Sequence, residues 1–164
     1  MSVDNQAFRR ALGAFTTGVC IVTCPPREGN DPVALTVSSF ASVSLEPPLV
    51  LWCIDKGSDR FSAFFEAEAY GVSVLGEGQD AVSMAFAGNG RLCDVTTQVA
   101  KTGAPLIDGA IAQLDCRIAA RHDAGDHVIL VGEVVHIVVS DERAPLVYHR
   151  GCYRQLAPDP DQRA

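Results

Sequence analysis

Short runs of apolar and β-branched residues, separated by Pro, Gly and Asp, recur along the chain and predict mainly β structure. A proline pair at 25–26 ends the first of these runs, and the polar loop 27–32 leads into the second. We therefore expect the first two strands to pair in antiparallel fashion. The expected short strands are 19–24, 33–38, 49–54, 70–75, 146–148 and 153–156.

Two longer runs predict a β-hairpin. Residues 110–122 alternate between apolar and polar positions, and residues 127–139 are rich in β-branched side chains. The turn sequence 123–126 separates them, and Gly132 is a plausible position for a β-bulge. In the first run the positions expected to face the core are Leu114, Cys116, Ile118 and Ala120, and the opposite face is expected to hold Gln113, Asp115, Arg117 and Arg121.

Helical spacing appears in only three places. An N-terminal helix is expected, with Asp4 or Asn5 as its cap. A second helix is expected to start at Ser58, and a third covers 79–86, after which 87–103 lacks periodicity and predicts a surface loop. The apolar positions are Ala7, Phe8, Ala11, Leu12 and Phe15 in the first helix and Phe61, Phe64 and Phe65 on the inner face of the second.

About seven strands joined mostly by tight turns, with a few short helices, favour a mainly β fold, an antiparallel barrel rather than a doubly wound parallel sheet. The 164 residues correspond to one domain, expected over 1–156, and the Pro- and Asp-containing segment 157–164 is expected to be a flexible tail. No apolar run reaches the roughly 18 residues needed to span a bilayer, and the first residues lack signal-peptide character. We expect a cytoplasmic protein that does not bind membranes.

The net charge and the cysteine content disfavour several further classes of function. A net charge of −7, spread along the chain, disfavours binding to nucleic acid. The six cysteines lie in apolar segments, and a domain of this length needs no disulfides, so we expect reduced thiols. Cys20 and Cys24 would lie about 13 Å apart on one strand face, too far for one tetrahedral metal site, and we expect no metal.

The densest polar segment lies at the end of the second expected strand. It carries five hydroxyl groups in nine positions, 36–44. One interpretation is a turn whose side chains bond their own backbone. The other is a site whose hydroxyls and backbone N–H groups meet a flavin ring edge or a phosphate.

Three further segments have two interpretations each. The sequence 53–58 places a strand end, Lys56 and a helix start together, which could bind an anion, although Ser58 could simply cap the helix. Residues 76–81 fit G-x-G-x-x-A, but no parallel βαβ unit follows, so we interpret them as a turn. His127, beside the hairpin turn, could contact a ligand at the barrel mouth or be an ordinary turn residue.

The order and spacing of several short motifs cover nearly the whole chain. They are Phe15-Thr16-Thr17-Gly18-Val19 followed by Ile21-Val22-Thr23, Leu35-Thr36-Val37-Ser38-Ser39-Phe40, Ser42-Val43-Ser44-Leu45-Glu46-Pro47-Pro48-Leu49, Phe86-Ala87-Gly88, Gly125-Asp126-His127, and Pro145-Leu146-Val147-Tyr148 with Gly151-Cys152-Tyr153. Together they resemble the flavin reductase family, whose members have an FMN-binding split-barrel fold and supply reduced flavin to two-component monooxygenases.

The resemblance implies a site and a reaction. Flavin, FMN or FAD, would lie along Thr36, Val37, Ser38 and Ser39 and along the strand end Cys53, Ile54 and Asp55, with Phe86 and Ala87 lining the pocket and Tyr148 nearby; Lys56, Ser58 and Arg91 would hold its phosphate, and His127 would position the nicotinamide. Hydride would pass from C4 of NADH (or NADPH) to flavin N5, and reduced flavin would leave for a partner monooxygenase. The resemblance also implies a homodimer with the flavin site near the interface.

Three other functions remain compatible with these residues. They are a non-catalytic flavin-binding or electron-storage protein on the same barrel, a related enzyme that oxidises a small substrate directly, and an interaction barrel without a cofactor. In the last of these the hydroxyl-rich segment would be only a structural turn. No basic patch marks a site for a 2′-phosphate along the sequence, which favours NADH over NADPH.

Overall fold

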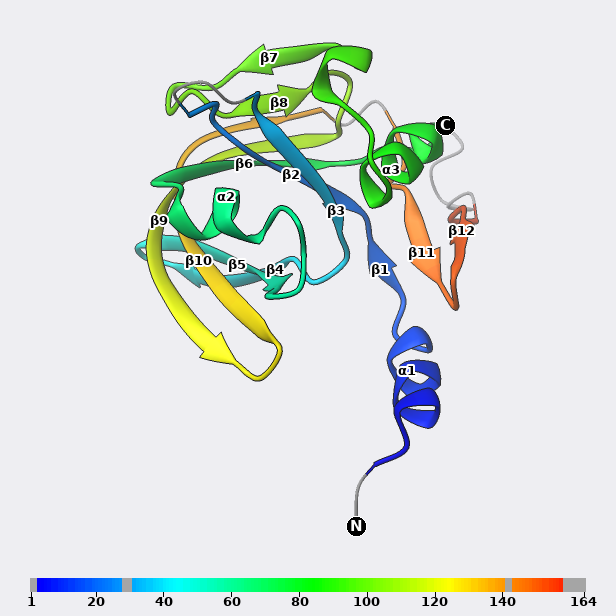
Figure 1. Ribbon diagram of the computed structural model, residues 1–164. Helices are drawn as coiled ribbons and strands as arrows, with labels where there is room; N and C mark the ends of the chain where they lie inside the picture. Colours follow the sequence, from blue (N-terminus) through cyan, green and yellow to red (C-terminus); the bar gives the residue numbers. More distant parts are fainter. Residues whose placement is uncertain (1–2, 28–30, 141–142, 158–164) are drawn as a thin grey trace.

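The computed structural model describes residues 3–27, 31–140 and 143–157, and most of the predicted tail, 158–164, lies outside the described residues. The fold is mainly β (Figure 1). The strands are β1 (Thr17–Gly18), β2 (Cys20–Cys24), β3 (Val33–Val37), β4 (Ala41–Leu45), β5 (Pro48–Asp55), β6 (Ala69–Val74), β7 (Thr97–Val99), β8 (Pro105–Ile107), β9 (Ala112–Ala124), β10 (His127–Val139), β11 (Val147–His149) and β12 (Cys152–Arg154). The helices are α1 (Asn5–Gly13), α2 (Phe61–Glu66) and α3 (Asp80–Ala87), with a 3₁₀ turn at Leu92–Asp94.

A seven-stranded sheet forms the body of the molecule. Its order is β3-β2-β6-β9-β10-β5-β4, and every pairing in it is antiparallel. The edge strands β3 and β4 are joined by residues 38–40 only, so the curled sheet is a split barrel whose edges do not pair along their length. The expected antiparallel barrel is confirmed, and the absence of a parallel unit here agrees with interpreting 76–81 as a turn.

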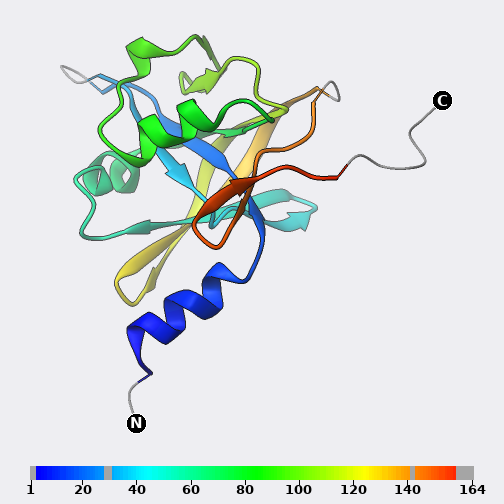
Figure 2. The same ribbon diagram turned by 90° about the vertical axis from the view of Figure 1, so that its right-hand side faces the viewer.

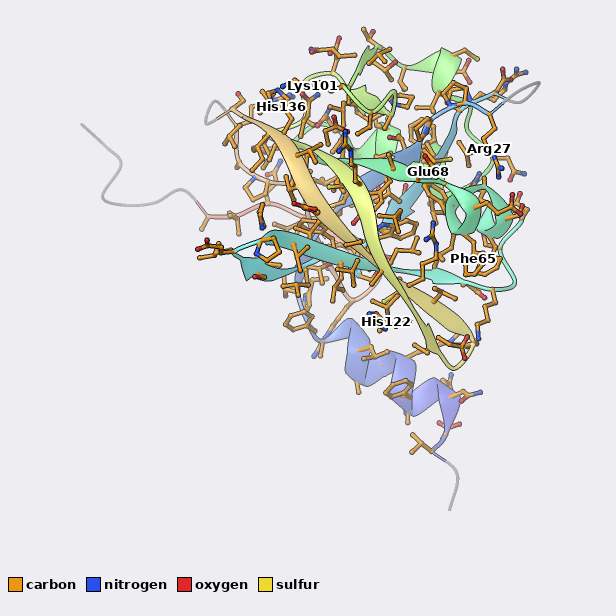
Figure 3. The ribbon with its side chains drawn as sticks, turned by 90° about the vertical axis from the view of Figure 1, so that its left-hand side faces the viewer. Arg27, Phe65, Glu68, Lys101, His122 and His136 are labelled. Atoms are coloured by element: carbon orange, nitrogen blue, oxygen red, sulfur yellow. The ribbon has the colours of Figure 1, made fainter. Side chains whose placement is uncertain are left out.

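The longest pairing is the β9–β10 hairpin, and it follows the sequence prediction closely. The strands face each other from His127, opposite Ala124, to Val139, opposite Ala112. The register shifts between Val131 and Gly132, which places a bulge at the predicted glycine. Figure 3 shows the hairpin with the labelled side chain of His122 on β9 and that of His136 on β10.

The polar face predicted for β9 was partly wrong, because Gln113 and Asp115 are buried. The segment predicted as a surface loop covers them: it contains β7, which pairs with β8. The side-chain amide of Gln113 donates to the Ile107 carbonyl at 2.7 Å, and Asp115 accepts from the backbone N–H of Thr102 at 3.2 Å. Burial of these groups is tolerable because each one has a hydrogen-bond partner.

Two clusters of apolar side chains form the core. Inside the barrel, Trp52 meets Phe64 and Tyr70 edge to face, with ring centroids 4.9 and 5.9 Å apart. The second cluster lies under α3 and the two small sheets and includes Ile21, Leu75, Phe86, Ile107 and Leu146. The prediction that Phe65 (labelled in Figure 3) faces inward was wrong, because its side chain is exposed. Its ring stacks on Phe61, and the guanidinium of Arg121 lies over it.

Two element boundaries also differ from the prediction. The hydroxyl-rich segment contains the edge strand β4, which pairs with β5 and was not predicted. Helix α2 begins at Phe61 rather than Ser58, because Asp55 accepts from the N–H of Gly57 and Ser58 accepts from the N–H of Arg60. These side chains bond nearby backbone groups and hold 55–60 as turns.

Helix α1 stands apart from the barrel. Its N-terminus is capped as predicted, since the Asp4 carboxylate accepts from the N–H of Ala7 at 2.8 Å. The helix extends away from the sheet in both views and has no buried residue (Figures 1 and 2). Over the described ranges, no helix is both long enough and apolar enough to cross a membrane.

The bulge glycine generates a stability prediction. A Cβ at Gly132 would lie 2.2 Å from the Tyr70 hydroxyl oxygen, so Gly132→Ala forces the buried ring or the strand to move. We expect the free energy of unfolding to fall by about 1–3 kcal/mol, the usual cost of overpacking, in urea denaturation. Gly18→Ala is the control, because an added Cβ there meets nothing within 4 Å. Equal stability of the two variants would contradict this account.

Candidate functional site

A cavity of about 200 Å³ lies where the end of β3, the end of α3 and the β11–β12 hairpin meet. We call it the β3 cavity. Five residues predicted for the flavin site line it, although they come from three separate segments of the chain. The lining residues are Val19, Thr36, Val37, Ser38, Ala87, Tyr148 and Tyr153.

A chain of hydrogen bonds fixes the walls of the β3 cavity. The Thr36 hydroxyl donates to the carbonyl of Ser83 at 2.6 Å, which holds α3 against β3. The Tyr153 hydroxyl donates to the Ser83 hydroxyl at 2.8 Å, which holds β12 against the same helix. Ser83 is buried, so these contacts join three elements in a setting where breaking either bond leaves a polar group without water.

The segment 38–40 joins this cavity to a second group of predicted residues at the end of β5. Ser38 lines the cavity, while the hydroxyl of its neighbour Ser39 accepts from the N–H of Cys53 at 3.0 Å and lies 3.4 Å from the Cys53 carbonyl. Burial raises the pKa of the Cys53 thiol, and the hydrogen bond with Ser39 opposes this shift. The raised pKa disfavours the thiolate form of Cys53, which is the form that a nucleophilic cysteine needs.

The turn of the long hairpin holds two predicted residues beside the end of β5. Lys56 donates through Nζ to the carbonyl of Gly125 at 2.7 Å and forms an ion pair with Asp123. His127 lies opposite Asp55 in the β5–β10 register. A phosphate bound by Lys56 would therefore have to share this cation with Asp123.

The imidazole of His127 has a fixed neighbour. Its Nδ1 lies 2.7 Å from Oδ1 of Asp126, and this hydrogen bond lowers the pKa of the Asp126 carboxyl. When Nδ1 donates to the carboxylate, Nε2 of the neutral ring is left as a hydrogen-bond acceptor. This arrangement suits a positioning role better than proton transfer.

Besides the residues around the end of β5, three more predicted residues do not line the β3 cavity. Ile54 and Phe86 are completely buried in the two core clusters, so they support the site from behind. Arg91 lines another cavity, of about 460 Å³, and its guanidinium is 3.3 Å from the Asp31 carboxylate. That cavity is also lined by Arg60, which donates to the carbonyls of Phe86 and Gly88 at the end of α3.

The part of the chain that the structure describes contains no candidate metal site and no disulfide bond. No group of three or more His, Cys, Asp or Glu side chains there is arranged to hold a metal ion. All six cysteines have free thiols, and Cys20, Cys24 and Cys116 are buried. Burial raises the pKa of both Cys20 and Cys116 to about 12, which keeps these thiols neutral.

The family model described as a flavin reductase like domain matches residues 12–157. The chain belongs to the flavin reductase family. The FMN reductase (NADH) SmoA of Agrobacterium fabrum is 48% identical over 155 residues, which cover 94% of this chain and 87% of that protein. The flavin-dependent monooxygenase reductase subunit HsaB of Mycobacterium tuberculosis is 35% identical over 161 residues, which cover 96% of this chain and 85% of that protein.

Solved structures agree with the family assignment. The NADH:FAD oxidoreductase SgcE6 of Streptomyces globisporus, in complex with NAD and FAD fragments, is similar with a TM-score of 0.90 and 36% identity. The match covers 98% of this chain and 99% of that one. The predicted family, split-barrel fold and NAD(P)H-dependent reduction of flavin are thereby confirmed for this flavin reductase.

Sequence reasoning missed two residues that shape the β3 cavity. Tyr153 stood in a motif that supported the resemblance, but only the register with Tyr148 shows that both rings line one cavity, 5.6 Å apart. No sequence motif pointed to Ser83, because its hydrogen-bond partners Thr36 and Tyr153 are 47 and 70 residues away in sequence. Contacts of this range depend on how the sheet curls.

The hydrogen bond between Tyr153 and Ser83 can be tested directly. We expect Tyr153→Phe to lower the free energy of unfolding by about 1–2 kcal/mol, because it leaves the buried Ser83 hydroxyl without its donor. Urea denaturation measures the change. Tyr148→Phe is the matched control, since it removes the same group from the other ring of the cavity, which is more exposed. Equal losses in both variants would count against a specific role for the Tyr153 hydrogen bond.

Proposed function

We propose that this flavin reductase binds the flavin ring in the β3 cavity and directs NADH to it from the side of His127. The observation that carries the proposal is the convergence of Thr36, Val37, Ser38, Ala87 and Tyr148 on one cavity. The lining fits a flavin, since it combines aromatic rings with hydroxyl and backbone groups able to meet alternating donors and acceptors.

Each part of the site has a role that its surroundings favour. The Ser38 hydroxyl and the backbone of 37–39 hydrogen-bond the ring edge. The ring of Tyr148 covers one side of the cavity, and Ala87 leaves room where a larger side chain would fill it. The cation of Lys56 lies at the end of β5 for the phosphate of the flavin, in exchange for part of its contact with Asp123, and Ser58 and Arg91 are the more distant candidates for the same group.

The two bound nucleotides supply the redox chemistry, a hydride transfer from nicotinamide C4 to flavin N5. The protein must hold the two rings within reach, which contributes to rate through orientation rather than through an acid or base. The acceptor Nε2 of His127 suits the carboxamide of a nicotinamide. Asp126 keeps the imidazole in that orientation, so His127 is a positioning residue.

Reduced flavin then leaves for a partner monooxygenase in the cytoplasm. The name of HsaB as a monooxygenase reductase subunit supports this destination.

Both NADH and the flavins FMN and FAD are named for the relatives of this chain, so we assign NADH as the reductant and leave both flavins as substrates. Free thiols at all six cysteines suit a reducing compartment. We treat residues 1–156 as one reductase domain.

The functional unit is a homodimer in this proposal. Phe8 and Leu12 form an exposed apolar stripe on helix α1, exposed Phe15 extends it just past the helix end, and the helix has no buried residue. An isolated helix of nine residues is not stable in water. A second copy of the chain would cover this stripe, and the exposed side chains of Val43 and Leu45 on the edge strand β4 offer a further apolar surface.

The reductase assignment predicts specific kinetics for His127→Ala. The wild-type protein should oxidise NADH under anaerobic conditions only when flavin is added. We expect the variant to raise the KM for NADH about tenfold, the value of one lost hydrogen bond of about 1.4 kcal/mol, and to leave the dissociation constant of flavin nearly unchanged. The pKa of the Asp126 carboxyl should rise toward its ordinary value, as carboxylate NMR can measure.

An unchanged KM for NADH would remove the role of His127. Flavin binding without reduction by NADH or NADPH would instead favour a non-catalytic flavin-binding protein. His122→Ala is the control, because His122 is an exposed residue on β9 of the same hairpin (Figure 3).

The homodimer generates a separate prediction. Leu12→Asp places a charge in the apolar stripe of α1 and should shift the protein from dimer to monomer in sedimentation velocity at micromolar concentration. Val99→Asp is the control, since Val99 is also exposed but lies on β7, at the far end of the molecule from α1 (Figure 1). A wild-type monomer, or a dimer that Leu12→Asp leaves intact, would contradict the proposed interface.

A further inference from the structure

A second cavity, of about 510 Å³, lies between α1 and the turn of the β11–β12 hairpin. We call it the arginine cavity. Three of its six lining residues are arginines, and no acidic residue lines it. The lining residues are Gln6, Arg9, Arg10, Gly13, Arg150 and Gly151.

The two sides of the arginine cavity are tied together by backbone. The N–H of Arg150 donates to the carbonyl of Gly13 at the end of α1, at 3.0 Å. Arg150 and Gly151 both have positive φ, 49° and 77°, as in a two-residue turn that usually takes Asn or Gly at its first position. An arginine in this conformation is unfavourable for the turn alone, which points to a use for its side chain.

In the described part of the chain, the three guanidinium groups have no carboxylate partner, unlike three other cations of the protein. Arg27, Lys56 and Arg91 each form an ion pair with a carboxylate. Within the residues that the structure describes, the ion pairs found do not involve Arg9, Arg10 or Arg150. In a chain of net charge −7, a cavity with three positive charges and no carboxylate in its wall is suited to an anion.

The arginine cavity is the neighbour of the β3 cavity along one hairpin. Tyr148 and Tyr153 face each other in the register of β11 and β12 and line the β3 cavity. Arg150 follows Tyr148 by two residues, about 7 Å along the strand. A nucleotide whose ring lies against the tyrosines therefore has its phosphate groups within reach of the arginines.

The dimer proposed above leaves this cavity accessible on α1. At 100° per residue, the face holding Phe8 and Leu12 and the face holding Arg9 and Arg10 point about 130° apart around the helix. One face of α1 is free for a second copy of the chain, and the other faces the hairpin turn (Figure 1).

We propose that the arginine cavity binds phosphate groups of the nucleotides used in flavin reduction, as an extension of the β3 cavity. This inference rests on the proposed position of the flavin. The phosphate could come from the adenylate half of FAD, from the pyrophosphate of NADH or from the flavin side chain, the last in place of the Lys56 contact proposed above. All three present the oxyanions that arginine binds through paired N–H donors.

The test compares single variants with a matched control. Arg9→Gln, Arg10→Gln and Arg150→Gln each remove one charge from the cavity. Arg154→Gln removes the same charge from the same hairpin, outside the lining, where the side chain bonds only the adjacent Tyr153 carbonyl. Dissociation constants for riboflavin, FMN and FAD are measured by flavin fluorescence, and the KM for NADH at saturating FMN.

We expect each cavity variant to weaken the binding of at least one phosphate-bearing nucleotide about tenfold, which is the effect of losing one charge-assisted hydrogen bond. Riboflavin affinity should stay unchanged, and the control should stay within about twofold of wild type. If FMN and FAD both bind more weakly, the cavity holds the flavin phosphate. If only FAD binds more weakly, the cavity holds its adenylate half. A raised KM for NADH shows that the cavity holds the pyrophosphate of the reductant. Inorganic pyrophosphate should compete in the wild type and lose this effect in the variants.

Unchanged constants in all three cavity variants would overturn the proposal, as would an equal effect on riboflavin or an equal effect of Arg154→Gln. These outcomes differ from failure of the proposed function, in which the wild-type protein would not bind or reduce any flavin.

Discussion

The pairing of β9 with β10 is the constraint on which the rest of the structure depends. These strands lie in the middle of the sheet order, with β6 on one side and β5 on the other, so they join its two halves. The bulge at Gly132 bends the hairpin where the ring of Tyr70 fills the barrel. The far end of the same hairpin places His127 and Asp126 against the end of β5.

The site is assembled from edges of this sheet rather than from its centre. Strand β3 ends at the cavity, the segment 38–40 leads on to β4 and bonds β5 through Ser39, and α3 and the β11–β12 hairpin complete the walls. Buried Ser83 joins three of these elements through two hydrogen bonds. A redox enzyme that relies on ring positioning needs this rigidity more than it needs a titrating side chain.

Local signals in the sequence predicted most of the fold. The alternation of β9 and the turn before His127 identify the long hairpin, because register and turn type are encoded within a few residues of each other. Gln113 and Asp115 were misplaced because the β7–β8 pair that buries them comes from a segment with no periodicity of its own. Strand β4 was missed because its serines match a turn as well as they match an edge strand.

The candidate site was likewise predictable where local motifs mark its residues, and not where it depends on contacts between distant segments. Thr36, Ser38 and Tyr148 carry family motifs, so the resemblance located them. The links through Ser83, and the meeting of Arg9 with Arg150 from opposite ends of the chain, depend on tertiary structure alone. The distribution of charge along the sequence shows no basic patch, but the fold brings Arg9, Arg10 and Arg150 together around one cavity.

The isolation of α1 separates assembly from folding. Because no residue of the helix is buried in the single chain, its side chains add little to the stability of that chain. In the proposed homodimer, substitutions in α1 would therefore change subunit affinity while the core of the barrel stays unaffected. Selection would then adjust the lifetime of the dimer and the packing of the barrel through different residues.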